Sequence, residues 1–203
     1  ELIEKRYGLS STKIQEKGDF LEQSFNVLNE NDVVIIGRLG EHSADNNKPM
    51  GSNVENFIRG ANCTVITVGE HFEPPKQFIF AYEFSTVCEK MLQRIAQSDL
   101  LKQISCHLLY VGDHPHMLAE PTKYLQAAGF DVVAAYRYGD VAENILEYQK
   151  EHDIALIVLG AFSHSKIHQF FLGSITTTIF RNANVPLLVA KWLSLQHIVI
   201  RKY

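Results

Sequence analysis

GSNVENFIRGANCTVITV, residues 51–68, and GSITTTIFRNANVPLLVA, residues 173–190, are two versions of one stretch, and this repeat decides the fold. The second version lies 122 residues after the first. An apolar run that ends in glycine precedes each version: VVIIG ends at Gly37 and LIVLG ends at Gly160. The period of 122 residues is longer than one unit of a repeat array, so the repeat indicates two copies of one domain.

The second copy carries a full set of alternating strands and helices. Apolar runs predict five strands, which begin near Gln77, Ile104, Phe130, Ile154 and Val185. Helical patterns lie between them at residues 85–97, 115–128, 140–152 and 174–181. Strands that alternate with helices imply crossover connections. The second copy is therefore predicted to be an α/β domain with a doubly wound, open, parallel five-stranded sheet.

The first copy contains only the later elements of this set. We expect Glu1–Tyr7 to be the end of a helix, residues 10–16 a strand, residues 19–29 a helix and residues 52–59 another helix, with strands at VVIIG and CTVITV. Two strands and a helix are missing, and we expect them in a longer natural protein. The predicted boundaries are a partial first domain at 1–70, a linker at 71–76, a complete second domain at 77–191 and a tail at 192–203.

Composition narrows the class of protein. The chain has 203 residues, of which 46% are hydrophobic, and a formal net charge of −4. This charge argues against a surface that binds nucleic acid. The sequence shows neither a secretory leader nor an apolar run that could cross a membrane. Three widely spaced cysteines are typical of reduced, buried thiols, so we expect a cytoplasmic protein.

The loop between Gly160 and Ser174 is the candidate binding motif. Glycine at the strand exit would let the backbone approach a ligand, and Gly173-Ser174 opens a helix whose first N–H groups are unpaired. The helix dipole favours an anion there, and Ser174 and Thr176 add hydroxyl donors. The spacing is typical of a phosphate cradle. The alternative is that Ser174 only caps the helix.

The second copy resembles the universal stress protein family. The resemblance rests on FIFAYE, on GDVAENILEYQKEHDIALIVLG, and on the Gly160…Gly173-Ser174 loop followed by VPLLV. The glycine-ended strand, the loop and the Gly-Ser helix start recur in the same order in the first copy. The chain is therefore similar to the tandem subgroup, with an incomplete first domain. The resemblance implies an adenine nucleotide alpha hydrolase-like fold. It also implies that the fifth strands pair, giving a pseudo-dimer of the two copies, and that the protein forms a homo-oligomer.

The family includes members that bind ATP and members that do not. By resemblance, a nucleotide would contact Ala81, Glu83, Val111, Leu159, Gly160, Ser163, Gly173, Ser174, Ile175 and Thr176. Ser163 stands where the pattern has glycine, and Glu83 stands where binders have aspartate. Because of the resemblance, we expect a stress-response protein that binds ATP or a related adenine nucleotide in its second domain. The alternative is a stress protein without nucleotide that acts as a dimeric interaction module.

Histidines suggest a third possibility, a zinc-binding variant. His114 and His116 follow one strand, and His164 and His168 lie in the loop after another. Neutral imidazoles can bind zinc, but no cysteine or carboxylate stands at metal-ligand spacing beside them. The sequence also shows neither a nucleophile elbow nor a Walker lysine, so no catalytic residue is predicted and slow ATP hydrolysis is the most that we expect.

Overall fold

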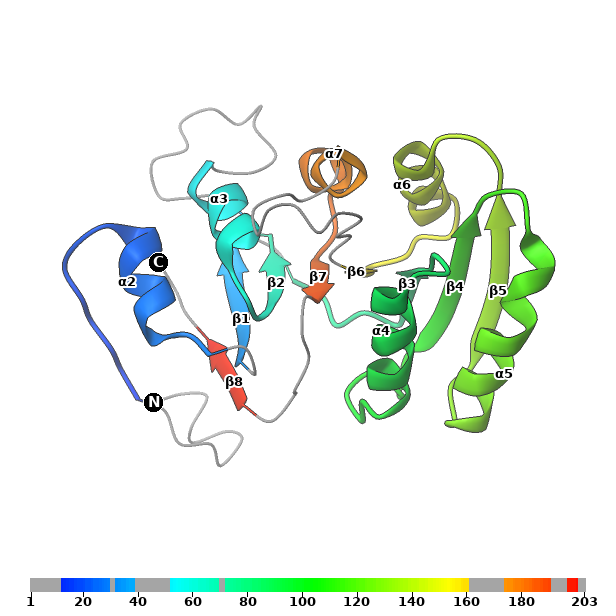
Figure 1. Ribbon diagram of the computed structural model, residues 1–203, viewed down its shortest axis with the longest axis horizontal. Helices are drawn as coiled ribbons and strands as arrows, with labels where there is room; N and C mark the ends of the chain where they lie inside the picture. The colour runs from blue at the N-terminus through cyan, green and yellow to red at the C-terminus, as the bar shows by residue number, and fades with distance from the viewer. Residues whose placement is uncertain are drawn as a thin grey trace.

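The computed structural model describes residues 12–29, 32–38, 52–69, 72–160 and 174–190, together with the backbone of residues 197–200. Within these residues, eight strands form one sheet with helices on its two faces (Figure 1). The prediction of an α/β fold with a largely parallel sheet is confirmed.

The C-terminal segment, residues 77–190, forms five strands in the predicted places. They are β3 (Gln77–Ala81), β4 (Ser105–Val111), β5 (Val132–Arg137), β6 (Ile157–Gly160) and β7 (Leu187–Ala190). The helices between them are α4 (Thr86–Ala96), the 3-10 helix η1 (Pro115–Leu118), α5 (Ala119–Ala127), α6 (Val141–Glu151) and α7 (Ser174–Asn182). The five strands lie in the order β5-β4-β3-β6-β7 and are all parallel. This is the doubly wound arrangement predicted from the sequence.

The N-terminal segment, residues 12–69, contributes α2 (Phe20–Val27), β1 (Asp32–Gly37), α3 (Ser52–Gly60) and β2 (Thr64–Val68). The prediction of a strand at residues 10–16 is wrong for the described residues 12–16, which form neither strand nor helix. In this stretch Ile14 is the only apolar side chain and it is 55% exposed, so no apolar face stabilises a strand. The helix expected at Glu1–Tyr7 lies outside the described residues. A further strand from the tail, β8 (His197–Ile200), pairs with β1.

Two glycine–aspartate pairs start equivalent helices in the two segments. Asp19 caps α2, and its Oδ1 accepts hydrogen bonds from the backbone N–H groups of Leu21 and Glu22, both at 3.0 Å. Asp140 caps α6, and its Oδ1 accepts from the N–H of Glu143 at 2.9 Å. In each case the aspartate satisfies N–H groups that have no partner inside the helix. The sequence repeat therefore corresponds to a repeat of local structure.

The two segments meet where β2 pairs with β7, which is the only antiparallel pairing of the described sheet. The predicted pairing of CTVITV with VPLLVA is thus present. Ile66 lies opposite Leu188, its counterpart in the repeat. On either side, Val65 faces Val189 and Thr67 faces Leu187. Each of these pairs maps onto the other when the 122-residue offset is applied, which is the pattern of a two-fold, isologous contact.

The helices α3 and α7, beside these strands, make contacts with the same reciprocal pattern. Nη2 of Arg59 on α3 donates to Oγ1 of Thr177 on α7 at 3.2 Å. Nη2 of Arg181 on α7 donates to the Glu55 carboxylate on α3, at 3.4 and 3.3 Å from its two oxygens. Arg59 and Arg181 are counterparts in the repeat, as are Glu55 and Thr177. Each arginine therefore crosses to the same position of the other segment.

Two apolar clusters cover the two faces of the sheet. One cluster includes buried side chains of α3, α6 and α7, and it continues across the join between the two segments. The other includes buried side chains of α4 and α5 and serves mainly the C-terminal segment. Figure 1 shows α3, α7 and α6 along one side of the sheet and α4 on the other.

Candidate functional site

The candidate site lies where β3 and β6 separate at their carboxyl ends. The chain leaves β3 through α4 toward one face, and it leaves β6 toward α7 on the opposite face. In an open α/β sheet, such a reversal of strand order leaves a crevice outside the carboxyl ends of the strands. The fold therefore positions the end of β3, the end of β6 and the start of α7 around one place.

Four of the predicted nucleotide-binding residues belong to one apolar cluster on the α6 and α7 side. Ala81 and Leu159 lie opposite each other in the pairing of β3 with β6, and both are buried. Val111, at the end of β4, and Ile175, on α7, pack against the same cluster. The structure thus brings together residues that are as much as 94 positions apart in the sequence. They therefore share one packed region at the carboxyl ends of β3, β4 and β6.

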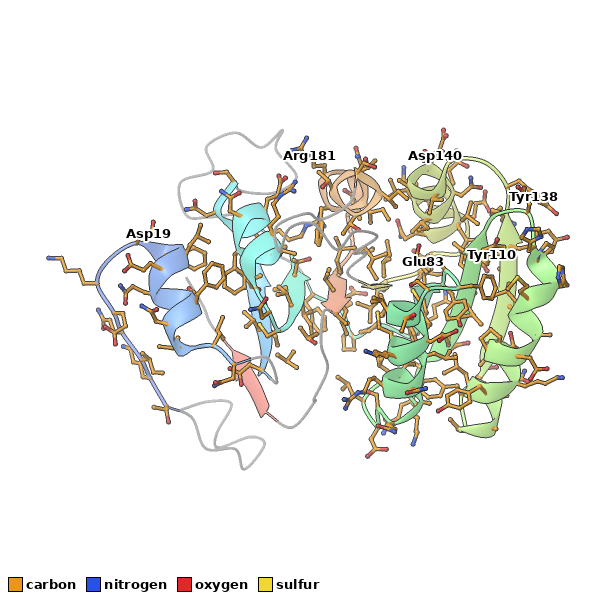
Figure 2. All side chains as sticks on the ribbon, viewed as in Figure 1. Asp19, Glu83, Tyr110, Tyr138, Asp140 and Arg181 are labelled. Atoms are coloured by element: carbon orange, nitrogen blue, oxygen red, sulfur yellow. The ribbon has the colours of Figure 1, made fainter. Side chains whose placement is uncertain are left out.

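Glu83 follows β3 in a tight turn that leads into α4 (Figure 2). The backbone N–H of Ser85 donates to the carbonyl of Glu83 at 2.7 Å, and Oγ of Ser85 accepts from the N–H of Cys88 at 3.2 Å. Ser85 therefore caps α4 and fixes the turn. Glu83 itself is half-buried. The capped turn therefore fixes the backbone of Glu83 at the end of β3.

Gly160 packs more tightly than the sequence indicates. A Cβ atom at this position would lie 3.1 Å from Sδ of Met91, 3.4 Å from Sγ of Cys88 and 3.6 Å from Cγ1 of Val87. All three neighbours are on α4. From the sequence, this glycine is interpreted as room for a ligand. The structure gives a different reason: glycine lets α4 approach the end of β6.

The first turn of α7 presents one hydroxyl to solvent and buries another. Ser174 is the first residue of the helix and is exposed. Thr176 is fully buried, and its Oγ1 has no hydrogen-bond partner among the residues that the structure describes. A buried hydroxyl without a partner costs about 1–3 kcal/mol, so an unpaired one is uncommon. Ser163 and Gly173, also predicted to contact nucleotide, lie outside the described residues.

A row of aromatic rings, called here the aromatic chain, packs on the α4 side of the sheet at the carboxyl ends of β3 and β4. The rings of Phe80, Tyr82, Phe84 and Tyr110 follow one another with centroid separations of 5.6, 5.2 and 5.0 Å. Burial, with smaller contributions from Cys88 and Glu89, raises the pKa of Tyr82 to about 12, so this phenol stays neutral. No motif in the sequence marks these rings. Their alternation in the sequence at positions 80, 82 and 84 is the signal that could have found them.

The three thiols are buried and none forms a disulfide. Burial raises the pKa of Cys88 to about 11 and that of Cys106 to about 12, and Cys63 is equally enclosed. Thiols held in this protonated state are poor nucleophiles and poor metal ligands. The cysteines therefore serve as small apolar side chains in the core.

The zinc hypothesis receives little support from the described part of the chain. The rings of His114 and His116 lie 6.0 Å apart between centroids, and both side chains are exposed. Among the residues that the structure describes, no group of three or more histidine, cysteine, aspartate or glutamate side chains could hold a metal ion. His164 and His168 lie outside those residues.

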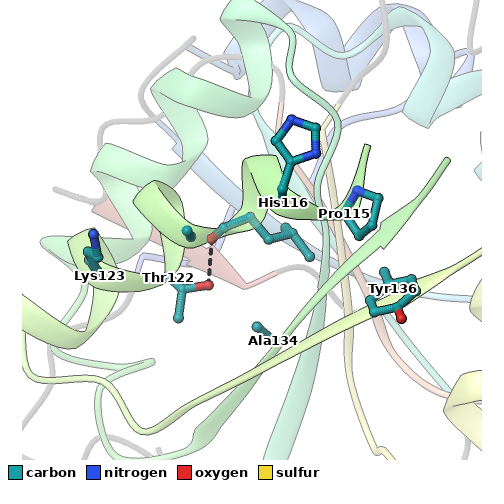
Figure 3. Close-up of a pocket in the computed structure, with 8 residues that line it drawn as sticks. Pro115, His116, Thr122, Lys123, Ala134 and Tyr136 are labelled. Atoms are coloured by element: carbon teal, nitrogen blue, oxygen red, sulfur yellow. Dashed lines mark hydrogen bonds between the residues drawn. The ribbon is translucent and has the colours of Figure 1, made fainter. Parts of the chain in front are cut away.

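A separate shallow groove of about 550 Å³ lies against β5, under η1 and α5 (Figure 3). Pro115, His116, Lys123 and Tyr136 are among its lining residues. Oγ1 of Thr122, also in the lining, donates to the carbonyl of Leu118 at 2.7 Å and so is already paired. None of the ten predicted nucleotide-binding residues lines this groove.

Comparison with known proteins identifies the family. Residues 118–191 match the family described as "Universal stress protein family". The curated "Universal stress protein Slr1230" of Synechocystis sp. is 31% identical over 188 residues, which cover 89% of this chain. The chain belongs to the universal stress protein family. It spans 66% of the length of the Synechocystis protein.

Solved structures of universal stress proteins share the fold. A universal stress protein from Archaeoglobus fulgidus DSM 4304 matches with a TM-score of 0.64 and 20% identity, over 84% of this chain and 65% of that one. A universal stress protein solved in complex with cAMP matches with a TM-score of 0.50 and 19% identity, over 59% of this chain and 98% of that one. In the described residues of the present protein, no helix combines the length and the apolar character needed to cross a membrane.

Proposed function

We propose that this universal stress protein binds an adenine nucleotide, such as ATP, at the carboxyl ends of β3 and β6. The bound nucleotide would make it a nucleotide-responsive protein of the stress response. The base would lie against Ala81 and Val111, with Glu83 close enough to accept a hydrogen bond from its amino group. The phosphates would lie at the start of α7, where helix N–H groups and the dipole favour anions.

The observation that carries the proposal is the buried Thr176 hydroxyl. It lies in the first turn of α7, and its Oγ1 has no partner among the described residues. A phosphate oxygen would satisfy it and would also accept from the N–H groups of that turn. A universal stress protein with this fold was solved in complex with cAMP, which supports the proposal.

A titration with ATP, followed by calorimetry, tests the proposal. Thr176→Val removes the hydroxyl and keeps the shape of the side chain. A hydrogen bond to a charged group is worth about 1.5–3 kcal/mol, so the variant should bind about 10- to 100-fold more weakly. The variant should unfold at the same temperature as the wild type without ligand, or higher, because it also removes an unpaired buried polar atom.

Thr64→Val is the matched control. Thr64 lies on β2, is fully buried, and its Oγ1 likewise has no partner among the described residues. This variant shares the chemical change but lies away from the proposed site, so its affinity for ATP should equal that of the wild type. If neither ATP, ADP, AMP nor cAMP binds the wild type at millimolar concentration, the proposal is wrong.

We also infer that the two segments are related as two copies of one domain, joined as a pseudo-dimer through β2 and β7. The reciprocal strand pairs and the reciprocal contacts of Arg59 and Arg181 support this relation. The variants Arg59→Gln and Arg181→Gln test it. Arg181→Gln removes the contact with Glu55, whereas Arg59→Gln removes both the contact with Thr177 and the ion pair of Arg59 with Glu55 inside α3. Each should lower the free energy of unfolding measured in urea, and Arg59→Gln should lower it more.

A further inference from the structure

The strand β5 forms one end of the described sheet. It stands first in the order β5-β4-β3-β6-β7-β2-β1-β8, and within the described residues it pairs only with β4 (Figure 1). An open edge of this kind presents a row of N–H and C=O groups that can pair with another strand. Proteins that remain monomeric usually protect such an edge with lysine, proline, a bulge or a covering helix. An unprotected edge therefore indicates a surface for association.

The middle of β5 has none of these protections among the described residues. Residues 133–136, VAAY, contain no charge and no proline. Val133 is 42% exposed and Tyr136 is 50% exposed. The ladder with β4 runs without a bulge through the whole strand. The groove under η1 and α5 is lined by Ala134 and Tyr136, so these helices leave that side of the strand accessible (Figure 3). The edge is therefore apolar, regular and open.

The hydrogen bonds to β4 show which backbone groups of β5 point to the open edge. The carbonyl of Asp131 accepts from the N–H of Cys106 at 2.8 Å. The carbonyl of Arg137 accepts from the N–H of Gly112 at 2.9 Å. Successive residues of a strand direct their N–H and C=O groups to alternate sides, so the odd-numbered residues of β5 bond to β4. The even-numbered residues direct these groups to the open edge: Val132, Ala134 and Tyr136.

We propose that the open edge of β5 is an interaction surface for a second copy of this chain, whose own β5 extends the sheet in antiparallel orientation. In an antiparallel ladder, residues that direct their backbone groups to the shared edge lie opposite one another. A two-fold axis at Ala134 meets this condition. It places Val132 opposite Tyr136 of the second copy, and the two Ala134 residues opposite each other. Such a contact uses the same surface on both copies and closes as a dimer.

The charges at the two ends of β5 select this register, and they favour a second copy over an unrelated strand. With the axis at Ala134, Asp131 lies opposite Arg137 of the second copy at each end of the pairing. An axis one residue to either side also satisfies the backbone, but it leaves both charges opposite uncharged residues. Opposite charges on facing residues stabilise a strand pair. The sequence DVVAAYR is thus complementary to itself when two copies run in opposite directions.

Both charged side chains are placed to take part in this pairing. Asp131 is exposed, and its Oδ2 accepts from Oγ of Ser105 at 2.7 Å, which holds the carboxylate beside the strand. The side chain of Arg137 is 38% exposed, and its Nη2 donates to Oε2 of Glu151 at 2.8 Å. A guanidinium has several N–H donors, so Arg137 can bond to a second carboxylate while it keeps the first. The two side chains project from the same face of β5, because they are an even number of positions apart.

The mass of the full chain in solution gives the first test. We expect sedimentation to show a reversible dimer as the protein concentration is raised through the micromolar range. Ala134→Pro removes an N–H that points to the open edge, a position at which an edge strand tolerates proline. The change removes two hydrogen bonds from the dimer, so the dimer should dissociate about ten-fold more readily, with the melting temperature of the monomer nearly unchanged.

Ala134→Val is the matched control, because it changes the same residue and keeps the N–H. It should dimerise at least as strongly as the wild type, since valine favours strands. A dimer that Ala134→Pro leaves intact would mean that the copies meet elsewhere, and would overturn the proposal. A wild-type chain that stays monomeric would also overturn it, because the edge would then have to accept an unrelated strand.

Charge reversal tests the register. Asp131→Arg and Arg137→Asp each place like charges opposite each other at both ends of the pairing, so each variant alone should be monomeric. A mixture of the two variants in equal amounts restores opposite charges at both ends, and it should form a dimer with one copy of each. A chain that carries both changes is the control and should form a dimer with itself. A mixture that stays monomeric while the wild type dimerises would overturn the proposal.

Discussion

Replacement of Gly160 by alanine tests whether this glycine exists for packing against α4. The added methyl group would lie 3.1 Å from Sδ of Met91, which is closer than an ordinary van der Waals contact. The contacts with Cys88 and Val87, at 3.4 and 3.6 Å, are ordinary. One overlap of this kind in a packed core costs about 1–3 kcal/mol. The loss of freedom in the unfolded chain opposes it by about 0.4–1 kcal/mol.

The expected net destabilisation of Gly160→Ala is therefore about 1 kcal/mol. For a chain of this size, that corresponds to a fall of about 2–4 °C in the melting temperature. Urea unfolding monitored by circular dichroism measures the difference directly. Met91→Ala removes the atom that the new methyl group would meet, so the two changes should not be additive. The double variant should be more stable than the sum of the single variants by at least about 0.5 kcal/mol.

Two results would refute this reasoning. A Gly160→Ala protein as stable as the wild type would mean that α4 and β6 have room for a side chain. A strictly additive double variant would mean that Met91 is not the atom that limits the space. ATP titration of the same proteins adds a functional readout: if packing is the role of Gly160, the double variant should recover whatever affinity Gly160→Ala loses.

Burial lowers the pKa of His107, and His152 lowers it further. The imidazole of His107 therefore binds a proton more readily in the unfolded chain than in the folded one. The free energy of unfolding should therefore fall as the pH drops below about 6.5, and His107→Gln should flatten this dependence in urea titrations at pH 7.5 and 5.5. Glu55→Gln should cost about 1 kcal/mol at low salt, and less at 1 M salt, because the Glu55 carboxylate pairs with Arg59 at 2.5 Å and with Arg181 at 3.3 Å, and both pairs are partly exposed to solvent. A loss that salt does not change would contradict an ionic contact. Cys88 and Cys106 should react with a disulfide reagent at pH 8 only in denaturant, and rapid labelling of the folded protein would show that they are accessible.

Local patterns predicted the second half of the molecule well. The apolar runs after Gln77 and before Gly160, and the glycine–aspartate pair at 139–140, correspond to observed strands and a helix start. These signals are local because side-chain periodicity and capping act within a few residues. The wrong prediction of a strand at residues 12–16 is explained by the absence of such a local signal. Residues 12–16 contain one apolar side chain, so a strand there is predicted only by the order of the elements and not by the residues themselves.

The candidate site was predicted as a set of residues, but not as an arrangement. The resemblance named Ala81, Val111 and Leu159, and the structure places them in one apolar cluster. The aromatic chain from Phe80 to Tyr110 and the contact of Gly160 with α4 were missed, because both depend on which helix covers which face. Such packing follows from the direction of each crossover, which one sequence read locally does not reveal.

The sequence by itself determined the repeat, the alternation of strands and helices, and the residues that meet at the ends of β3 and β6. The alternation follows from local periodicity and the repeat from a stretch that occurs twice, whereas the residues at the ends of β3 and β6 follow from the resemblance to the family. Only the tertiary structure decided that Thr176 is buried without a partner in the described residues, and that residues 197–200 lie beside β1. The edge of a strand accepts any chain segment that satisfies its backbone groups and covers its apolar faces. The choice among such segments is made by distance and connectivity in the folded sheet.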